Sequence, residues 1–148
     1  AVSGPGIATL LDFLVESGRT PRTPGTEALR RLPREQRPTA IAAAAAREPA
    51  CARALDLFVE LYARVCADLC AVFLPSGGLY LAGGIAARHE GRFLAGDRFM
   101  RTFSANYRPH LDALARSTPV RIVRDYSVSL LGAADACAAH VGGGSSRA

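Results

Sequence analysis

The chain has 148 residues, of which 49% are hydrophobic and 21% are charged, so it can form one globular domain with a sizeable core. All 18 of its basic residues are arginine, which excludes a catalytic or phosphate-binding lysine, and the net charge of +5 is modest. No stretch approaches about 18 consecutive apolar residues, and no basic segment precedes an apolar run at the start. We therefore expect no membrane span and no signal peptide. The first residue is Ala1 rather than Met, which suggests a fragment or a processed product.

The first predicted helix begins near Pro5, with Ser3 or Gly4 as its cap. Gly4 and Gly6 form a Gly-x-Gly pattern, but Thr9 stands where a dinucleotide-binding loop has its third glycine, and no strand precedes it. We therefore reject that loop. The free backbone N–H groups at this helix start are still candidates for contact with an anion or a hydroxylated ligand. The apolar face of the helix is predicted to be Ile7, Leu10, Leu11 and Leu14.

Residues 19–38 are rich in arginine and proline, and a basic segment of this kind can bind nucleic acid. The segment has no Phe, Tyr or Trp to stack on bases, so we expect no nucleic-acid partner. We interpret it as a solvated connection that includes a short helix over residues 26–31. Thr39 is the predicted cap of the next helix, which extends through an alanine-rich run to Arg47.

The longest predicted helix covers residues 49–74 and has an apolar and a charged side. We expect it to pack on a sheet as a core helix. Cys66 and Cys70 lie four residues apart without a neighbouring histidine, which does not predict a zinc site. We interpret all four cysteines as small apolar residues of a reduced cytosolic core. The predicted apolar side consists of Leu55, Phe58, Val59, Tyr62, Cys66, Leu69 and Phe73.

Residues 78–85 are the centre of the predicted fold. Residues 79–82 are apolar without alternation, which predicts a short strand covered on both faces. Gly83 and Gly84 follow, where glycine allows a sharp turn and leaves no side chain in the way of a ligand. Because open α/β sheets bind ligands at the carboxyl ends of their strands, this glycine pair is the main candidate site. A plain strand-to-helix turn is the alternative.

A second strand is predicted at residues 119–123, after short helices that bury the aromatic residues around position 99. Helical sequence between two strands favours a parallel pair with a right-handed crossover. Asp125 follows the second strand and is interpreted as a capping residue, and Ser127 is the predicted cap of the last helix. Residues 142–148 are predicted to be a flexible tail or linker.

No catalytic residue and no metal ligand is predicted in this chain. The acidic residues lie along polar helix faces without forming a pair, and no nucleophile elbow or Walker-type phosphate loop occurs. The histidines are scattered, and we interpret each of them as a solvated side chain: His89, His110 and His140.

The order of these segments resembles the C-terminal part of bacterial ATP-dependent glucokinases. The resemblance extends to about His140, so we expect residues 1–141 to be the C-terminal portion of the large domain of such a kinase. The matching segments are Ser3-Gly4-Pro5-Gly6-Ile7, Arg31-Leu32-Pro33, Thr39-Ala40-Ile41, Pro49 with Ala54-Leu55 and Phe58, residues 78–85, residues 119–123, and Leu130-Leu131-Gly132-Ala133-Ala134.

This resemblance implies an α/β fold of the actin-like ATPase (ribonuclease H-like) type, present here only in part. It implies that a phosphoryl group passes from ATP, with Mg²⁺, to the 6-hydroxyl of glucose in the cytoplasm, which gives glucose 6-phosphate. By the same resemblance Gly83 and Gly84 lie beside the adenosine. The helix start with Ser3, Gly4 and Gly6 follows directly on a glutamate that binds the sugar.

The sequence also departs from this family. The family's phosphate-binding hairpin, its aspartate base and its sugar-binding Glu and His residues do not occur in these residues. Phosphoryl transfer depends on positioning and charge stabilisation, so we expect the 148-residue chain alone to be inactive. Ala87 stands where the family often has proline, and residues 104–106 stand where it often has a Lys-Gly-Arg-like turn.

Two further expectations follow. The alternative to a kinase part is a non-catalytic, kinase-derived module for oligomerisation or sugar-linked regulation, whose tail links it to another domain. In either case an open sheet edge or apolar face favours self-association, and we expect a homodimer.

Overall fold

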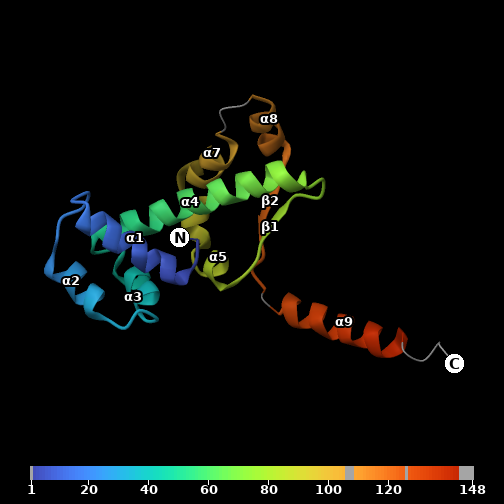
Figure 1. The fold of residues 1–148 in the computed structure, drawn as a ribbon, viewed down its shortest axis with the longest axis horizontal. Coiled ribbons are helices and arrows are strands. Elements are labelled where there is room, and N and C mark those ends of the chain that lie inside the picture. The colour runs from blue at the N-terminus through green and yellow to red at the C-terminus, as the bar shows by residue number, and fades with distance from the viewer. Residues whose placement is uncertain (1, 106–108, 126, 144–148) are drawn as a thin grey trace.

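The computed structural model describes residues 2–105, 109–125 and 127–143. A long central helix, α4, runs through this part, and shorter helices and a small sheet lie around it (Figure 1). The elements in chain order are α1 (Gly4–Glu16), α2 (Pro24–Arg31), α3 (Arg37–Ala44), α4 (Pro49–Phe73), β1 (Leu79–Leu81), α5 (Gly84–Arg88), α6 (Glu90–Leu94), the 3₁₀ turn η1 (Ala95–Asp97), α7 (Arg98–Ser104), α8 (Pro109–Ser117), β2 (Val120–Ile122) and α9 (Val128–Gly143).

Helix α1 forms as the sequence predicts. Ser3 is its cap, because the backbone N–H of Gly6 donates to Ser3 Oγ over 3.3 Å, and Pro5 lies in the first turn, where no intrahelical N–H is needed. The predicted apolar face is buried and packs on α4. Helix α2 begins at Pro24, two residues before the predicted start at residue 26, and it ends at Arg31 as predicted. Thr23 is its cap.

The prediction of a solvated arginine segment is wrong for two of its arginines. Arg30 and Arg37 both bind Asp12 of α1, with nitrogen–oxygen distances of 2.8 and 2.6 Å, and their side chains are only 18% and 12% exposed. Arg30 also pairs with Glu16 and Glu27. These ion pairs fix α2 and α3 on α1.

Helix α3 begins earlier than predicted. It starts at Arg37 and ends at Ala44, so Thr39 lies within its first turn and is not the cap. The physical reason is Pro38, whose fixed φ suits the first turn of a helix and places the start before the threonine.

Helix α4 matches its predicted bounds closely, but its surroundings differ. It packs mainly on α1, α3, α6, α7 and α8, not on a sheet. Aromatic rings continue the core from α4 to α7 through ring contacts of 5.4–6.0 Å: Phe58, Tyr62, Phe93, Phe99 and Phe103.

Two residues of the predicted apolar side of α4 are not in the core. Leu69 is 43% exposed and Phe73 is 72% exposed, because no described element covers their face of the helix, although Cys70 on the other face is buried. Together with Val65 and Val72 they form an exposed apolar surface at helical spacing, which we call the α4 stripe.

Three of the four cysteines fit the predicted core. Cys51, Cys66 and Cys70 are buried and free, whereas Cys137 is free but exposed. Burial raises the pKa of the Cys51 and Cys66 thiols to about 11, so both remain protonated and unreactive at neutral pH.

The two strands form the parallel pair that the sequence predicts, with Leu79 opposite Val120 and Leu81 opposite Ile122. The prediction that β1 is covered on both faces is wrong. Tyr80 is 60% exposed on the outer face, where the Arg121 guanidinium lies 5.6 Å from its ring centroid. In the described residues only the other face of this sheet is packed.

Helix α9 extends away from the other elements (Figure 1). Its side chains up to position 140 are exposed. Ser127 directly precedes it, and the Ser127 carbonyl accepts from the backbone N–H groups of Leu130 and Leu131. The backbone N–H of Ser127 donates to Asp125 Oδ1 over 2.9 Å, so Asp125 binds the residue before the helix and not a helical N–H. The helix continues through Gly143, two residues into the predicted tail, and residues 144–148 lie outside the described part. Within residues 2–105, 109–125 and 127–143, no helix has the length and apolarity needed to cross a membrane.

Candidate ligand-binding site

The start of α1 and the glycine turn after β1 are far apart in the sequence but line the same pocket. This pocket has a volume of about 340 Å³ and lies between α1, α3 and α5. Figure 1 shows the start of α1 beside α5. The lining residues are Gly4 and Ile7 of α1, Pro38, Thr39 and Ala42 of α3, Gly84, Ile85 and Arg88 of α5, and His89. We call it the α1–α3–α5 pocket.

Core packing holds the walls of this pocket in place. Ile7 of α1 and Ala86 of α5 are each only 1% exposed, and Ile41 of α3 is fully buried. Each of the three helices is therefore anchored in the core by one face, while its neighbouring residues face the pocket. The pocket walls are mostly small or apolar residues with a few polar groups, a composition that is typical of small-molecule sites.

The structure places the predicted site residues in different ways. Gly4 and Gly84 line the pocket, and Ser3 and Gly83 precede them in the chain. Gly6 is buried inside α1, where its N–H binds Ser3 Oγ. The two segments that the sequence suggested for two different ligand groups are thus adjacent walls of one space.

The two glycines of the turn have different backbone conformations. Gly83 has a φ of +111°, which L-amino acids with side chains rarely adopt. Gly84 has no such φ, and a Cβ built on it would lie 3.8 Å from the nearest atoms, which belong to the Arg88 side chain. Gly83 is therefore needed for the turn itself, whereas Gly84 is the glycine at the pocket wall.

Sequence reasoning missed two side chains of this pocket. Arg88 lies four residues after Gly84 on α5, so the helical spacing from the glycine was a signal that could have found it. His89 was interpreted as solvated, but it is half-buried. Burial lowers the pKa of the His89 imidazole, and the nearby positive charges of Arg92 and Arg88 lower it further.

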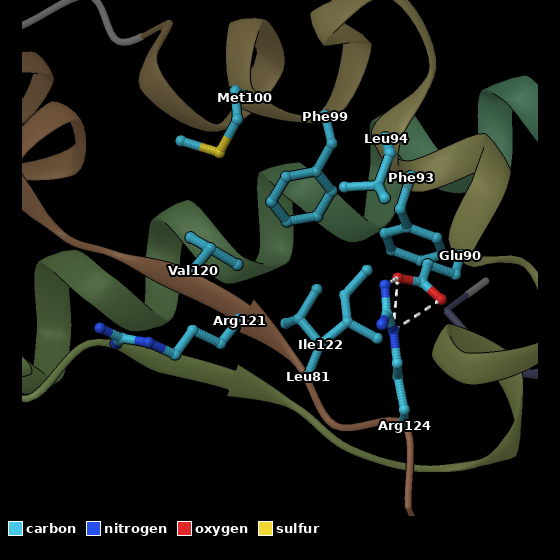
Figure 2. Close-up of a pocket in the computed structure, with 10 residues that line it drawn as sticks. All are labelled: Leu81, Glu90, Phe93, Leu94, Phe99, Met100, Val120, Arg121, Ile122 and Arg124. Atoms are coloured by element: carbon cyan, nitrogen blue, oxygen red, sulfur yellow. Dashed lines mark hydrogen bonds and ion pairs between the residues drawn. The ribbon is translucent and has the colours of Figure 1, made fainter.

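A second, larger pocket of about 570 Å³ lies between the packed face of the sheet and helices α6 and α7 (Figure 2). Its walls are mostly apolar, among them Phe93, Phe99 and Ile122. Its acidic side chain, Glu90, is bound by Arg124 through both carboxylate oxygens at 2.9 and 3.1 Å. None of the site residues predicted from the sequence lines it, and its ion pair is already satisfied, so the smaller pocket is the better candidate.

The described residues contain no group of three or more His, Cys, Asp or Glu side chains placed to hold a metal ion. The Mg²⁺ that the resemblance implies therefore has no all-protein ligand cluster in this part of the chain. No step is assigned to that ion here.

Comparison with known proteins decides what kind of chain this is. A profile of the Glucokinase family matches residues 1–140. The chain belongs to the glucokinase family. This confirms the resemblance of its segments to bacterial glucokinases.

Individual bacterial glucokinases are similar to a smaller part of this family member. The glucokinase of Brucella abortus biovar 1 (strain 9-941) is 38% identical over 84 residues, which are 57% of this chain and 24% of that protein. The glucokinase of Nostoc sp. (strain PCC 7120) is 37% identical over 89 residues, 60% of this chain and 25% of that protein. The glucokinase of Synechocystis sp. (strain PCC 6803) is 39% identical over 87 residues, which are 59% of this chain and 23% of that protein. The chain thus spans about a quarter of the length of these relatives, and no solved structure matches it.

Proposed function

We propose that this chain is the nucleotide-side part of a glucokinase, which transfers a phosphoryl group from ATP to the 6-hydroxyl of glucose and gives glucose 6-phosphate. The observation that carries the proposal is that Gly4 and Gly84, from the two segments that resemble ligand-binding segments of the family, line one pocket. In this proposal Gly83 and Gly84 lie beside the adenosine. Ser3, Gly4 and Gly6 form the helix start on the side of the sugar.

The walls of the pocket suit a nucleoside. Ala42 and Ile85 are partly exposed and offer apolar surface to a flat base, and the Thr39 hydroxyl offers one hydrogen-bonding group. A glycine at position 84 leaves this wall without a side chain, so a ligand can approach the backbone closely.

The proposal includes the fold and the location of the whole enzyme. Residues 1–141 would be the C-terminal portion of the large domain of an actin-like ATPase fold, and the two parallel strands with flanking helices are compatible with such a part. The reaction would take place in the cytoplasm, where free thiols such as those of the four cysteines persist.

The chain contributes binding rather than proton transfer. The lining residues of the α1–α3–α5 pocket include no carboxylate, so none of them corresponds to the aspartate base of the family. We accordingly expect the isolated 148-residue chain to form no glucose 6-phosphate.

The test is a coupled assay for glucose 6-phosphate on the full-length product of the gene, with ATP, magnesium and a small panel of hexoses. The key variant is Gly84→Val, which fills the pocket wall, and its matched control is Gly91→Val, because a Cβ at Gly91 meets nothing within 4 Å. We expect Gly84→Val to raise the KM for ATP by roughly tenfold or more, equivalent to about 1.4 kcal/mol, with little change for glucose. Absence of turnover on every hexose by a folded full-length protein would overturn the kinase proposal in favour of the non-catalytic module.

We also propose that the chain self-associates as a homodimer. The α4 stripe and the side chains of α9 leave apolar surface exposed at two places. Contiguous apolar surface of this kind on a globular protein marks an interaction surface.

A further inference from the structure

Arg88 is the one permanently charged side chain among the residues that line the α1–α3–α5 pocket. Its Cζ, Nε and Nη2 atoms each lie 3.8 Å from the position that a Cβ would take on Gly84. A point equally distant from three atoms of a planar group lies over the plane of that group. The guanidinium therefore turns its face toward Gly84, and its N–H donors, which lie in the plane, are directed away from the glycine.

No carboxylate of the described residues pairs with Arg88, although other arginines nearby are paired. Arg92 binds Asp56 over 3.0 Å, and Arg124 binds Glu90. Asp56 and Glu90 are thus already engaged by other arginines. The charge of Arg88 remains uncompensated at the wall of the pocket, and the same charge contributes to the lowered pKa of the neighbouring His89 imidazole.

An uncompensated guanidinium with free in-plane donors is suited to one class of ligand group. Arginine binds phosphate oxygens through two parallel N–H···O bonds, and such charged hydrogen bonds are stronger than neutral ones. The sequence contains no lysine, so an arginine has to supply any side-chain cation that this chain offers to a phosphate.

We propose that Arg88 binds a phosphate group of the nucleotide in the α1–α3–α5 pocket and thereby selects phosphorylated nucleotides over the nucleoside. This inference rests on the proposed function, because it takes the ligand of the pocket to be ATP. It adds a residue and a selectivity that neither the sequence segments nor the family match assigns. Arg88 is a binding residue in this scheme and takes no part in proton transfer.

The experiment uses the full-length gene product and the variants Arg88→Gln and Arg88→Lys. The matched control is Arg47→Gln, which removes another exposed arginine that lies outside the pocket. Dissociation constants for ADP and adenosine are measured by titration calorimetry, and kcat and KM for ATP and glucose by the coupled assay. Calorimetry gives a result whether or not the enzyme turns over.

We expect Arg88→Gln to weaken ADP binding and raise the KM for ATP by roughly 10-fold or more, as for loss of a charged hydrogen bond. Adenosine binding, the KM for glucose and kcat should change less than about twofold, and Arg88→Lys should recover part of the loss. Equal weakening of ADP and adenosine would overturn the inference, since Arg88 would then act by packing on the nucleoside. Unchanged ADP binding in Arg88→Gln would also overturn it, while turnover and ATP dependence of the wild-type enzyme would leave the proposed function intact.

Discussion

At the scale of single residues, Gly83 and Gly84 show that adjacent glycines can be required for different reasons. The φ of +111° at Gly83 is strained for any residue with a Cβ, whereas a Cβ at Gly84 meets only ordinary contacts. We expect Gly83→Ala to lower the free energy of unfolding by about 1–3 kcal/mol. Gly84→Ala should lower it by less than about 1 kcal/mol. Urea unfolding of the 148-residue chain measures both, and equal losses would contradict the assignment of the turn to Gly83.

The His89 imidazole makes a pH-dependent contribution to stability. Its pKa in the folded chain lies below the ordinary 6.5, first because of burial and then because of Arg92 and Arg88. Between the two pKa values the unfolded chain binds more protons than the folded chain, so stability falls as the pH is lowered through 6.5 and levels off below the folded pKa.

We therefore expect His89→Gln to flatten the loss of stability between about pH 7 and the folded pKa of His89. His110→Gln, on the exposed surface of α8, is the control. Denaturant midpoints of the wild-type chain and both variants, measured across this pH range, test the contribution of His89. A slope that persists in His89→Gln but disappears in His110→Gln would refute the role of His89.

At the scale of elements, the sequence predicted what local periodicity determines. The buried face of α1 and the bounds of α4 followed from apolar residues at helical spacing, and the parallel strands followed from two short apolar runs separated by helices. The start of α3 was missed because Pro38 favours an earlier start than Thr39. The packing of α4 on helices was missed because periodicity shows which face is buried but not what covers it.

The residues of the candidate site were likewise predicted only where a local sequence pattern marks them. The glycines were found because a glycine pair at the end of a strand is typical of a sharp turn that leaves room for a ligand. Arg88 could be found only through its helical spacing from Gly84, and no local pattern separates His89 from a solvated residue. The meeting of α1 with α5 depends on tertiary packing between segments far apart in the chain. No pattern within either segment reports that contact.

Asp12 joins three helices, because it binds Arg30 of α2 and Arg37 of α3 from its place on α1. Asp12→Asn leaves two largely buried guanidinium groups without this anion, and loss of one partner of such a pair is costly. We expect a loss of about 1–3 kcal/mol in the free energy of unfolding, less than for fully buried pairs because Asp12 keeps some exposure. The control is Asp68→Asn on the exposed side of α4, which should change stability by less than about 0.5 kcal/mol. Similar effects of both variants would show that Asp12 does not fix α2 and α3.

At the scale of the whole molecule, two apolar surfaces stand out. Phe73 in the α4 stripe is 72% exposed, and Leu130 and Leu131 on α9 are 73% and 68% exposed. Helix α9 has 16 residues and no packing partner in the described part, and an isolated helix of this length is marginal in water. Burial of these surfaces would stabilise both elements, by about 25 cal/mol for each Å² of apolar area removed from water.

A second copy of the chain can provide that burial, so we expect the 148-residue protein to dimerise in a concentration-dependent way in sedimentation equilibrium. The variant Val72→Ser with Phe73→Ser should weaken the dimer by roughly tenfold or more, because it removes the two most exposed side chains of the stripe. Phe13→Ser, which replaces an exposed phenylalanine outside both surfaces, should leave the dissociation constant unchanged. If only Leu130→Ser with Leu131→Ser weakens the dimer, α9 and not the α4 stripe forms the contact. A monomer at every concentration, or a dimer of the 148-residue chain beside a monomeric full-length product, would contradict the homodimer and point to the rest of the protein as the cover of these surfaces.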